Sequence, residues 1–155
     1  MPIAISCNLK KKAPTQFCNY DFDTLCAFNG LFFWSNSDGL FTLSGEDDDG
    51  DAINAYFVLP PNDWGIENIK RIRSIFFGME TLGGMEVTVL DDEDHENVTA
   101  MPYGTYQKQA SNKCNPGRNN NQGRYISIKV GNADGKWFAV DNITVLPVVL
   151  NRKPR

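Results

Sequence analysis

Acidic side chains are the most numerous residues in this chain that could do chemistry. Five acids occupy the six positions from 46 to 51, and calcium prefers oxygen ligands of this kind. Asp47, Asp49 and Asp51 are therefore the candidate ligands for a calcium ion. Their spacing departs from the D-x-D-x-D-G pattern of an EF-hand loop, and no bidentate glutamate follows at the required distance. A solvated acidic loop is therefore the favoured interpretation, in which the chain has no cofactor, and calcium is the alternative.

Catalytic patterns are sparse. His95 is the one histidine, and it lies in a second acidic run at 91–96 that again has five acids in six positions. A single histidine excludes H-E-x-x-H zinc chemistry, and a Ser-His-Asp mechanism would depend on this one residue. The chain has no G-x-S-x-G, P-loop or G-x-G-x-x-G motif. A carboxylate pair could hydrolyse a glycoside, but among 19 acids such a pair carries no specificity. We therefore predict no catalytic residue and no enzyme.

Aromatic side chains suggest binding, because their rings can stack on sugars or fill subunit contacts. The candidates are Trp34, Trp64, Trp137 and Tyr125, with Arg124 beside the tyrosine. Trp137 and Phe138 have opposite strand parity, so one of the two should face outwards or into an interface. For each tryptophan, a place in the core or in a subunit contact is the simpler interpretation.

The net charge of −4 is unevenly distributed. Ten of the 19 acids lie in the two acidic runs, so the rest of the chain has nine acids against 15 bases. Basic residues gather near both ends and could face an oppositely charged partner or a second copy. These residues are Lys10, Lys11 and Lys12, and then Arg152, Lys153 and Arg155. Nothing in the pattern indicates sequence-specific binding of nucleic acid.

Length and composition indicate a soluble β protein. With 155 residues, 41% hydrophobic and 12% aromatic, the chain can bury a core without disulfides or metals. No apolar run approaches 18 residues and no signal peptide is evident, so we expect neither a membrane span nor secretion. Cys7, Cys18, Cys26 and Cys114 form no C-x-x-C motif and are expected to be free, buried thiols, with a disulfide among the first three as the alternative.

Turn signals divide the chain into about eight to ten short strands. Residues 1–30 are expected to form an arm or loop with a possible opening strand from Ile3 to Cys7, residues 31–150 a single β domain, and residues 151–155 a basic tail. Strand–turn–strand signals at 32–43, 69–90 and 123–140 predict hairpins. The strand at 52–59 should stop at Pro60, and a short helical turn is expected near 63–67.

Side-chain parity adds detail to the last two regions. The strand at 69–77 has two alternative faces, Ile72/Ser74/Phe76 and Arg71/Arg73/Ile75/Phe77. In the C-terminal strand the inward parity shifts from even to odd at Asp141-Asn142, which predicts a bulge. Together these features predict an all-β fold, an antiparallel β-sandwich of jelly-roll character with at most one short helix.

Residues 69–152 resemble small β-domains of neck and tail structural proteins of tailed bacteriophages. The matching features are a strand at 71–78, a strand at 86–92, a long polar loop that ends in Gly123-Arg124-Tyr125, and a closing Asn-x-x-Gly, aromatic, Asp-x-Ile pattern at 132–143. The resemblance implies a non-catalytic virion protein that packs with other virion proteins as a homo-oligomeric ring or lattice. Residues 1–60 match no such pattern.

Two further expectations accompany this resemblance. On the assembly hypothesis, Arg124 would orient the last hairpin through a charge-assisted bond to Asp134 or Asp141. The alternative function is a non-catalytic carbohydrate-binding module that uses the tryptophans, and a hydrolase that depends on His95 is a third.

Overall fold

The computed structural model describes residues 3–18, 21–45, 47–48, 50–91, 95–101, 111–119 and 121–150. The chain divides into two compact units, Met1–Gly45 (unit 1) and Glu46–Arg155 (unit 2). Within the described residues there are fifteen strands and no helix, and every strand pairing is antiparallel, which confirms the all-β prediction. No described segment forms a helix of the length and hydropathy needed to cross a membrane.

Unit 1 contains two small sheets. One is a hairpin of β1 (Ile3–Asn8) and β2 (Ala13–Cys18), and the other is a meander of β3 (Thr24–Phe28), β4 (Leu31–Asn36) and β5 (Gly39–Thr42). Asn29-Gly30 joins β3 to β4 with positive φ at both residues, as a two-residue hairpin turn with the strands' twist requires. β1 corresponds to the predicted opening strand.

The expected domain boundary between residues 30 and 31 differs from the one observed. β3 and β4 pair directly across it, from Thr24↔Ser35 to Phe28↔Leu31. A boundary there would cut a hairpin, and the chain instead divides after Gly45. The clear strand signal at residue 32 belongs to β4, the second strand of this hairpin. The first strand, β3, was missed because its sequence TLCAF does not alternate between apolar and polar residues.

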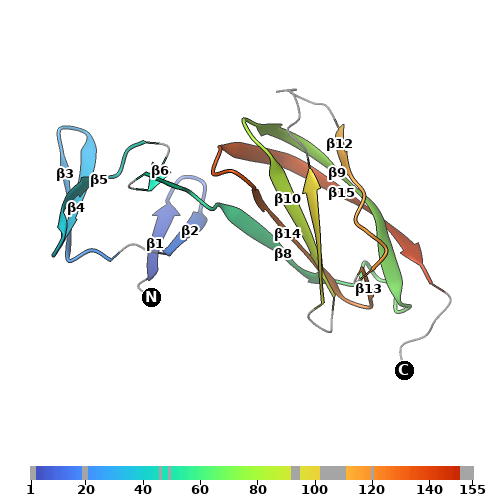
Figure 1. Ribbon diagram of the computed structural model, residues 1–155. Coiled ribbons are helices and arrows are strands. Elements are labelled where there is room, and N and C mark those ends of the chain that lie inside the picture. The colour runs from blue at the N-terminus through green and yellow to red at the C-terminus, as the bar shows by residue number, and fades with distance from the viewer. Residues whose placement is uncertain are drawn as a thin grey trace. The chain divides into compact units, whose positions relative to one another are not determined.

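Unit 2 is a β-sandwich preceded by a short ribbon of β6 (Asp47–Asp48) and β7 (Asp51–Ala52). One sheet has the order β11 (Glu96–Met101), β10 (Met85–Leu90), β14 (Ile126–Asn132), β8 (Tyr56–Asn62). The other is built on β9 (Lys70–Thr81), with β15 (Phe138–Val149) along one edge and β12 (Ser111–Cys114) and β13 (Gln122–Gly123) along the other. Figure 1 shows the two sheets as the layers of this unit.

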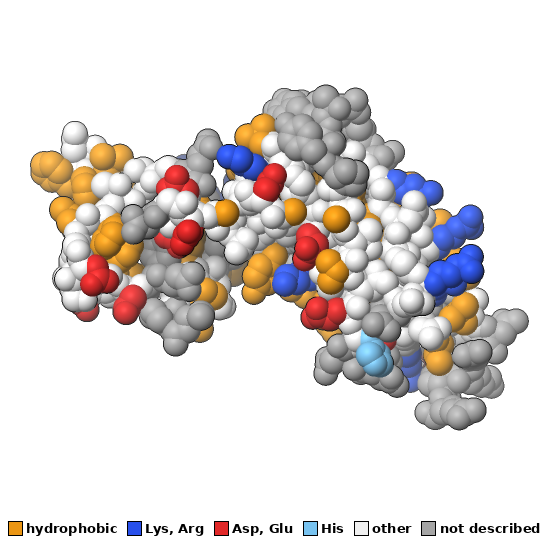
Figure 2. Space-filling view, in the orientation of Figure 1, with side chains coloured by type: hydrophobic (Ala, Val, Ile, Leu, Met, Phe, Trp, Pro, Cys, Tyr) orange, Lys and Arg blue, Asp and Glu red, His pale blue; other side chains and the backbone are white. Residues whose placement is uncertain are grey.

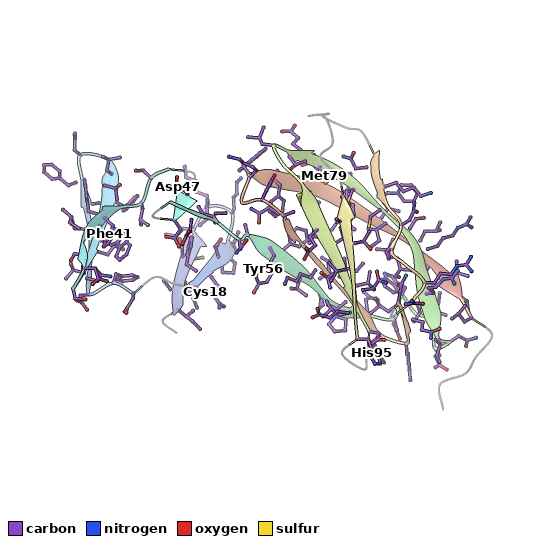
Figure 3. The ribbon with its side chains drawn as sticks, in the orientation of Figure 1. Cys18, Phe41, Asp47, Tyr56, Met79 and His95 are labelled. Carbon is purple, nitrogen blue, oxygen red and sulfur yellow. The ribbon has the colours of Figure 1, made fainter. Side chains whose placement is uncertain are left out.

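A single hydrophobic core lies between the two sheets. All twelve buried hydrophobic residues of the described chain belong to unit 2 and come from both sheets. The fully enclosed side chains include Ile75 and Phe77 on β9, Val87 and Val89 on β10, and Val130 on β14. Met79, labelled in Figure 3, continues the inward row of β9. This shared core makes the two sheets one folded body.

Two predicted hairpins are wrong. β14 pairs with β10 and β8, whereas β15 pairs with β9, so the Asn132–Gly135 turn connects strands of different sheets. In the same way β9 and β10 lie in opposite sheets. Alternation along a strand specifies which side faces the core, but not whether its sequence neighbour lies beside it or across the core. Connections that cross between sheets are typical of jelly rolls rather than meanders.

Register shifts explain the ambiguous parities. Val140 pairs with Met79 and Asn142 with Gly78, so Asp141 is the extra residue that was predicted there. A second shift lies between Leu146, which pairs with Ser74, and Pro147, which pairs with Ile72. Arg73 of β9 is therefore an extra residue without a paired residue on β15. Because of it, Ile72 faces the core together with Ile75 and Phe77. Neither of the two alternative faces predicted for 69–77 is therefore correct by itself.

The segment after β8 also differs from expectation. β8 runs through Pro60 and Pro61 to Asn62, with the register shifted opposite Ser127. Proline is tolerated here because β8 is an edge strand of its sheet. The helical turn expected near 63–67 is a tight turn in which Ile66 N–H donates to Asp63 O at 2.9 Å.

The long polar loop predicted at 108–123 contains β12 and β13. The strand predicted at 98–107 is β11 as far as Met101, and residues 102–110 lie outside the described chain.

Candidate interaction surfaces

The acidic residues proposed as calcium ligands lie on the exposed β6–β7 ribbon. Asp47 Oδ1 accepts the N–H of Gly50 at 3.3 Å, which closes the turn, and the side chains of Asp47 and Asp51 are exposed. Asp49 lies outside the described residues. Among the residues that are described, no three metal-ligating side chains come together. The geometry therefore gives Asp47 a turn-forming role.

His95 closes the connection between β10 and β11. Asp91 Oδ1 accepts the backbone N–H of His95 at 2.9 Å, and Asp91 Oδ2 lies 3.1 Å from His95 Nδ1. Asp91 N–H donates to His95 O. β10 and β11 pair directly on either side of the second acidic run, of which residues 92–94 lie outside the described chain. These hydrogen bonds between Asp91 and His95 hold together the two ends of the β10–β11 connection.

Three of the predicted binding residues gather at one end of the sandwich, around a lysine that the sequence did not single out. Lys70 has no exposed surface, and its Nζ donates to the carbonyl oxygen of Arg124. The same Nζ lies 5.9 Å from the ring centroid of Trp64, and the Arg124 guanidinium lies 5.2 Å from that of Tyr125. A lysine faces inward here because the extra residue at Arg73 changes the parity of β9, a change without a local sequence signal.

The partners expected for Arg124 lie far from it. Arg124 precedes β14 and Asp134 follows it, so the seven residues of β14 separate them by about 20 Å. Asp141 lies beside Gly78, whereas Gly123 pairs with Lys70. Eight residues of β9 therefore separate Asp141 from Arg124, roughly 25 Å. Asp134 instead accepts the N–H of Gly84 at 3.2 Å, so its role is to join the two inter-sheet connections.

The tryptophans do not form one stacking platform. Trp137 is 54% exposed and its carbonyl accepts the N–H of Leu82, at the far end of β9 from Trp64. Trp34 belongs to unit 1, where it stacks on Phe41 with centroids 4.2 Å apart and planes at 15°. Tyr125 is 42% exposed at the Lys70 end. A sugar ring could reach Trp137 or Tyr125, but not both.

Unit 1 is the exceptional surface of the described chain. No described residue up to Gly45 is buried, although the segment is rich in large hydrophobic residues. Eleven of them are exposed: Ile3, Ile5, Leu9, Phe17, Phe22, Leu25, Phe28, Leu31, Phe32, Leu40 and Leu43. Figure 2 shows hydrophobic side chains at the surface of this unit. These exposed apolar side chains make unit 1 the main candidate interaction surface of the described residues.

The β3–β5 sheet is apolar on both sides. The register places one set of side chains together, which we call face A: Leu25, Ala27, Phe32, Trp34 and Phe41. The opposite set is face B: Cys26, Phe28, Leu31, Phe33 and Leu40. Figure 3 shows side chains projecting from both sides of this sheet around the labelled Phe41. No residue of these three strands is charged.

The remaining predicted residues lie on turns or outside the described chain. Lys10, Lys11 and Lys12 form the exposed tip of the β1–β2 hairpin, where Asn8 Oδ1 accepts the N–H groups of Lys10 and Lys11, both at 3.1 Å. Arg152, Lys153 and Arg155 lie outside the described residues. The basic tip is thus open to a partner, whereas the structure says nothing of the tail.

All four cysteines are free thiols, as predicted, but only Cys114 is buried in the core. The prediction of buried thiols is wrong for Cys7, Cys18 and Cys26, because no described residue of unit 1 is buried. Burial raises the pKa of the Cys114 thiol from 9.0 to about 11, and a hydrogen bond with Thr99 partly opposes this shift. Cys114 is therefore an unreactive packing residue.

Comparison with models of protein families, with curated proteins and with solved structures finds no match for this chain. The functional conclusion therefore rests on the residues and their geometry.

Proposed function

We propose that this chain is a non-catalytic structural subunit of a tailed-phage particle, in the neck, the tail or on the capsid, and that unit 1 docks it to its neighbours. The observation that carries the assembly role is unit 1 itself, whose described residues include eleven exposed large hydrophobic side chains and no buried one.

The energetics of unit 1 support an assembly role. Burial of a Leu, Ile or Phe side chain stabilises a protein by about 1.5–3 kcal/mol, and small sheets need a packed hydrophobic face to be stable. Unit 1 has the residues for such a face but leaves them in solvent. A neighbouring subunit that covers them would supply the stability that the unit lacks alone.

The phage context is supported by the resemblance of residues 69–152 to neck and tail β-domains. That segment corresponds to most of the sandwich in unit 2, which gives a rigid body on which a docking unit can be carried. Unit 1 lies outside the resemblance.

Particle incorporation tests this proposal. A chain with a C-terminal epitope tag, expressed during lytic growth, should co-purify with particles on a density gradient and appear at one fixed location by immunogold electron microscopy. A tagged chain that remains in the soluble fraction while complete particles form would contradict the proposal. An untagged chain detected by mass spectrometry of the same particles controls for an effect of the tag.

A carbohydrate-binding module is the second candidate, because Trp137 and Tyr125 are exposed aromatic side chains. Binding on a glycan array that is lost in Trp137→Ala or Tyr125→Ala would favour it. Because the two rings lie at opposite ends of the sandwich, only the variant whose ring forms the site should lose binding, and the other variant should bind like wild type.

A further inference from the structure

The two apolar faces of the β3–β5 sheet point to a specific way of docking. An antiparallel sheet normally has one face on a core and the other in solvent, which gives alternating apolar and polar residues along its strands. β4 instead begins with the continuous run Leu31-Phe32-Phe33-Trp34, a pattern typical of strands buried on both faces. The sheet thus has the composition of a middle layer, yet both of its faces are exposed.

We propose that this sheet stacks head to tail between copies of the chain, with face A of one copy packed on face B of the next. This inference rests on the proposed assembly function and names its partner, a second copy. Because every copy carries both faces, one type of contact buries both of them in every subunit except those at open ends. A different protein would have to supply two separate covering layers.

The charge of unit 1 is consistent with a second copy as the occupant. Residues 1–45 carry three lysines and three aspartates, so unit 1 has no net charge, and the sheet itself has no charged residue. Face A of one copy can therefore pack on face B of another without burying a charge.

The exposed area can be estimated from the residues already named. On face A, Leu25 and Phe32 are 53% and 55% exposed, and on face B, Phe28 and Leu40 are 73% and 72% exposed. With about 150–250 Å² for a large side chain, these residues offer roughly 200 Å² on face A and roughly 300 Å² on face B. A contact of face A with face B therefore buries about 500 Å² from these residues, which is the size of a weak interface rather than a standard one of about 1,600 Å² in total.

Head-to-tail stacking makes a prediction that other arrangements do not. In Phe32→Lys face A is charged and face B intact, and in Leu40→Lys the reverse holds. Each variant alone should be monomeric in sedimentation velocity, because every contact needs one face of each kind. An equimolar mixture should form 1:1 heterodimers, since face B of the first variant can still pack on face A of the second.

The wild-type full-length chain should show concentration-dependent rings or stacks in the same experiment. Val58→Lys, at an exposed position of β8, is the matched control and should assemble like wild type. Urea unfolding of unit 2 in each variant should match wild type, because the substituted side chains lie outside its core.

Three results would overturn the inference. One is a wild-type chain that stays monomeric up to about 1 mM. Another is a mixture of the two variants that does not pair. The third is either single variant that still assembles, since survival of Leu40→Lys dimers would indicate face A packed on face A. None of these results bears on particle incorporation, so the proposed function would stand or fall separately.

Discussion

Trp64 and Gly65 show how single residues determine the end of the sandwich. Both have positive φ, 48° and 70°, in the turn closed by Asp63 and Ile66. Positive φ at both central residues is the pattern of a type I′ turn. A tryptophan in this region of φ is unusual, and it is held there because its ring packs against the core and lies near Lys70.

Gly65→Ala should lower the free energy of unfolding by about 1 kcal/mol. The Cβ of an alanine would meet nothing within 4 Å, so the loss would come from the backbone conformation alone. Gly65→Asn should cost less, because asparagine adopts positive φ more readily. Urea unfolding of both variants measures the difference, and equal stability of Gly65→Ala and wild type would contradict this account of the turn.

Cys114 should be protected from thiol reagents in the native state. At pH 8 a chromogenic disulfide reagent should titrate the three exposed cysteines, and the fourth thiol only after unfolding in urea. In Cys114→Ala the count in urea should fall to three, with the native count unchanged. Reaction of four thiols in the folded chain would show that the core admits the reagent.

The same thiol predicts alkaline destabilisation. Because its pKa is raised from 9.0 to about 11 in the folded chain, its contribution to stability is complete below pH 9. Above pH 9 the unfolded chain loses the thiol proton while the folded chain keeps it, so the free energy of unfolding falls as pH rises to 11. The loss is on the order of 2–3 kcal/mol. We expect the free energy of unfolding, measured by urea titration at several pH values between 9 and 11, to fall less steeply with pH in Cys114→Ala than in wild type.

At the scale of elements, the connections between sheets matter more than the strands they join. Asn132 ends β14, and its side chain donates to Ile53 O at 2.9 Å and to Lys136 O at 3.1 Å, and accepts from Ala55 N–H at 3.0 Å. Gly135 packs so closely that an added Cβ would lie 2.7 Å from Cβ of Ala52. The segment that enters unit 2 is therefore fastened to the β14–β15 connection.

Asn132→Ala should destabilise unit 2 by about 1–3 kcal/mol, because two carbonyls and one N–H lose their partner together. Asn54→Ala is the matched control, since this exposed amide lies in the same segment, and it should be close to neutral. Differential scanning calorimetry of both variants gives the comparison. If the two variants melt at the same temperature, the fastening role of Asn132 is wrong.

These connections also show what could be predicted from the sequence. The parity shift at Asp141 was readable, because β15 has apolar residues on both sides of the shift. Strand pairing was not, since Gly135 signals a turn whether the chain returns beside β14 or crosses the core. The burial of Lys70 was hidden by the extra residue at Arg73. The apolar residues of the β3–β5 sheet are visible in the sequence. Their division into face A and face B needed the strand register, and the exposure of both faces needed the structure.

At the scale of the whole molecule, the chain combines a unit with a core and a unit without one. All of the buried residues of the described chain lie in unit 2, so cooperative unfolding should come from this unit. The residues of unit 1 contribute exposed surface instead. On the proposed function, assembly and folding would be assigned to different parts of the sequence.

A fragment of residues 46–155 should therefore fold as a monomer and retain most of the urea unfolding free energy of the full chain. Residues 1–45 alone should give a disordered circular dichroism spectrum at low concentration, because three-stranded sheets without a packed face are marginal. The full-length chain is the reference for both measurements. A fragment 46–155 that fails to unfold cooperatively would show that unit 1 contributes to the core.

The order in which the sheets can form during synthesis follows from the pairing of β9 with β15, in which Ile75 lies opposite Val145. The second sheet cannot close until almost the whole chain has left the ribosome. The hairpins of unit 1 need only local contacts, and they emerge several seconds earlier at about 5–20 residues per second. If copies stack as proposed, nascent chains on one polysome would present these apolar sheets to each other first, and association would begin before any copy has finished folding.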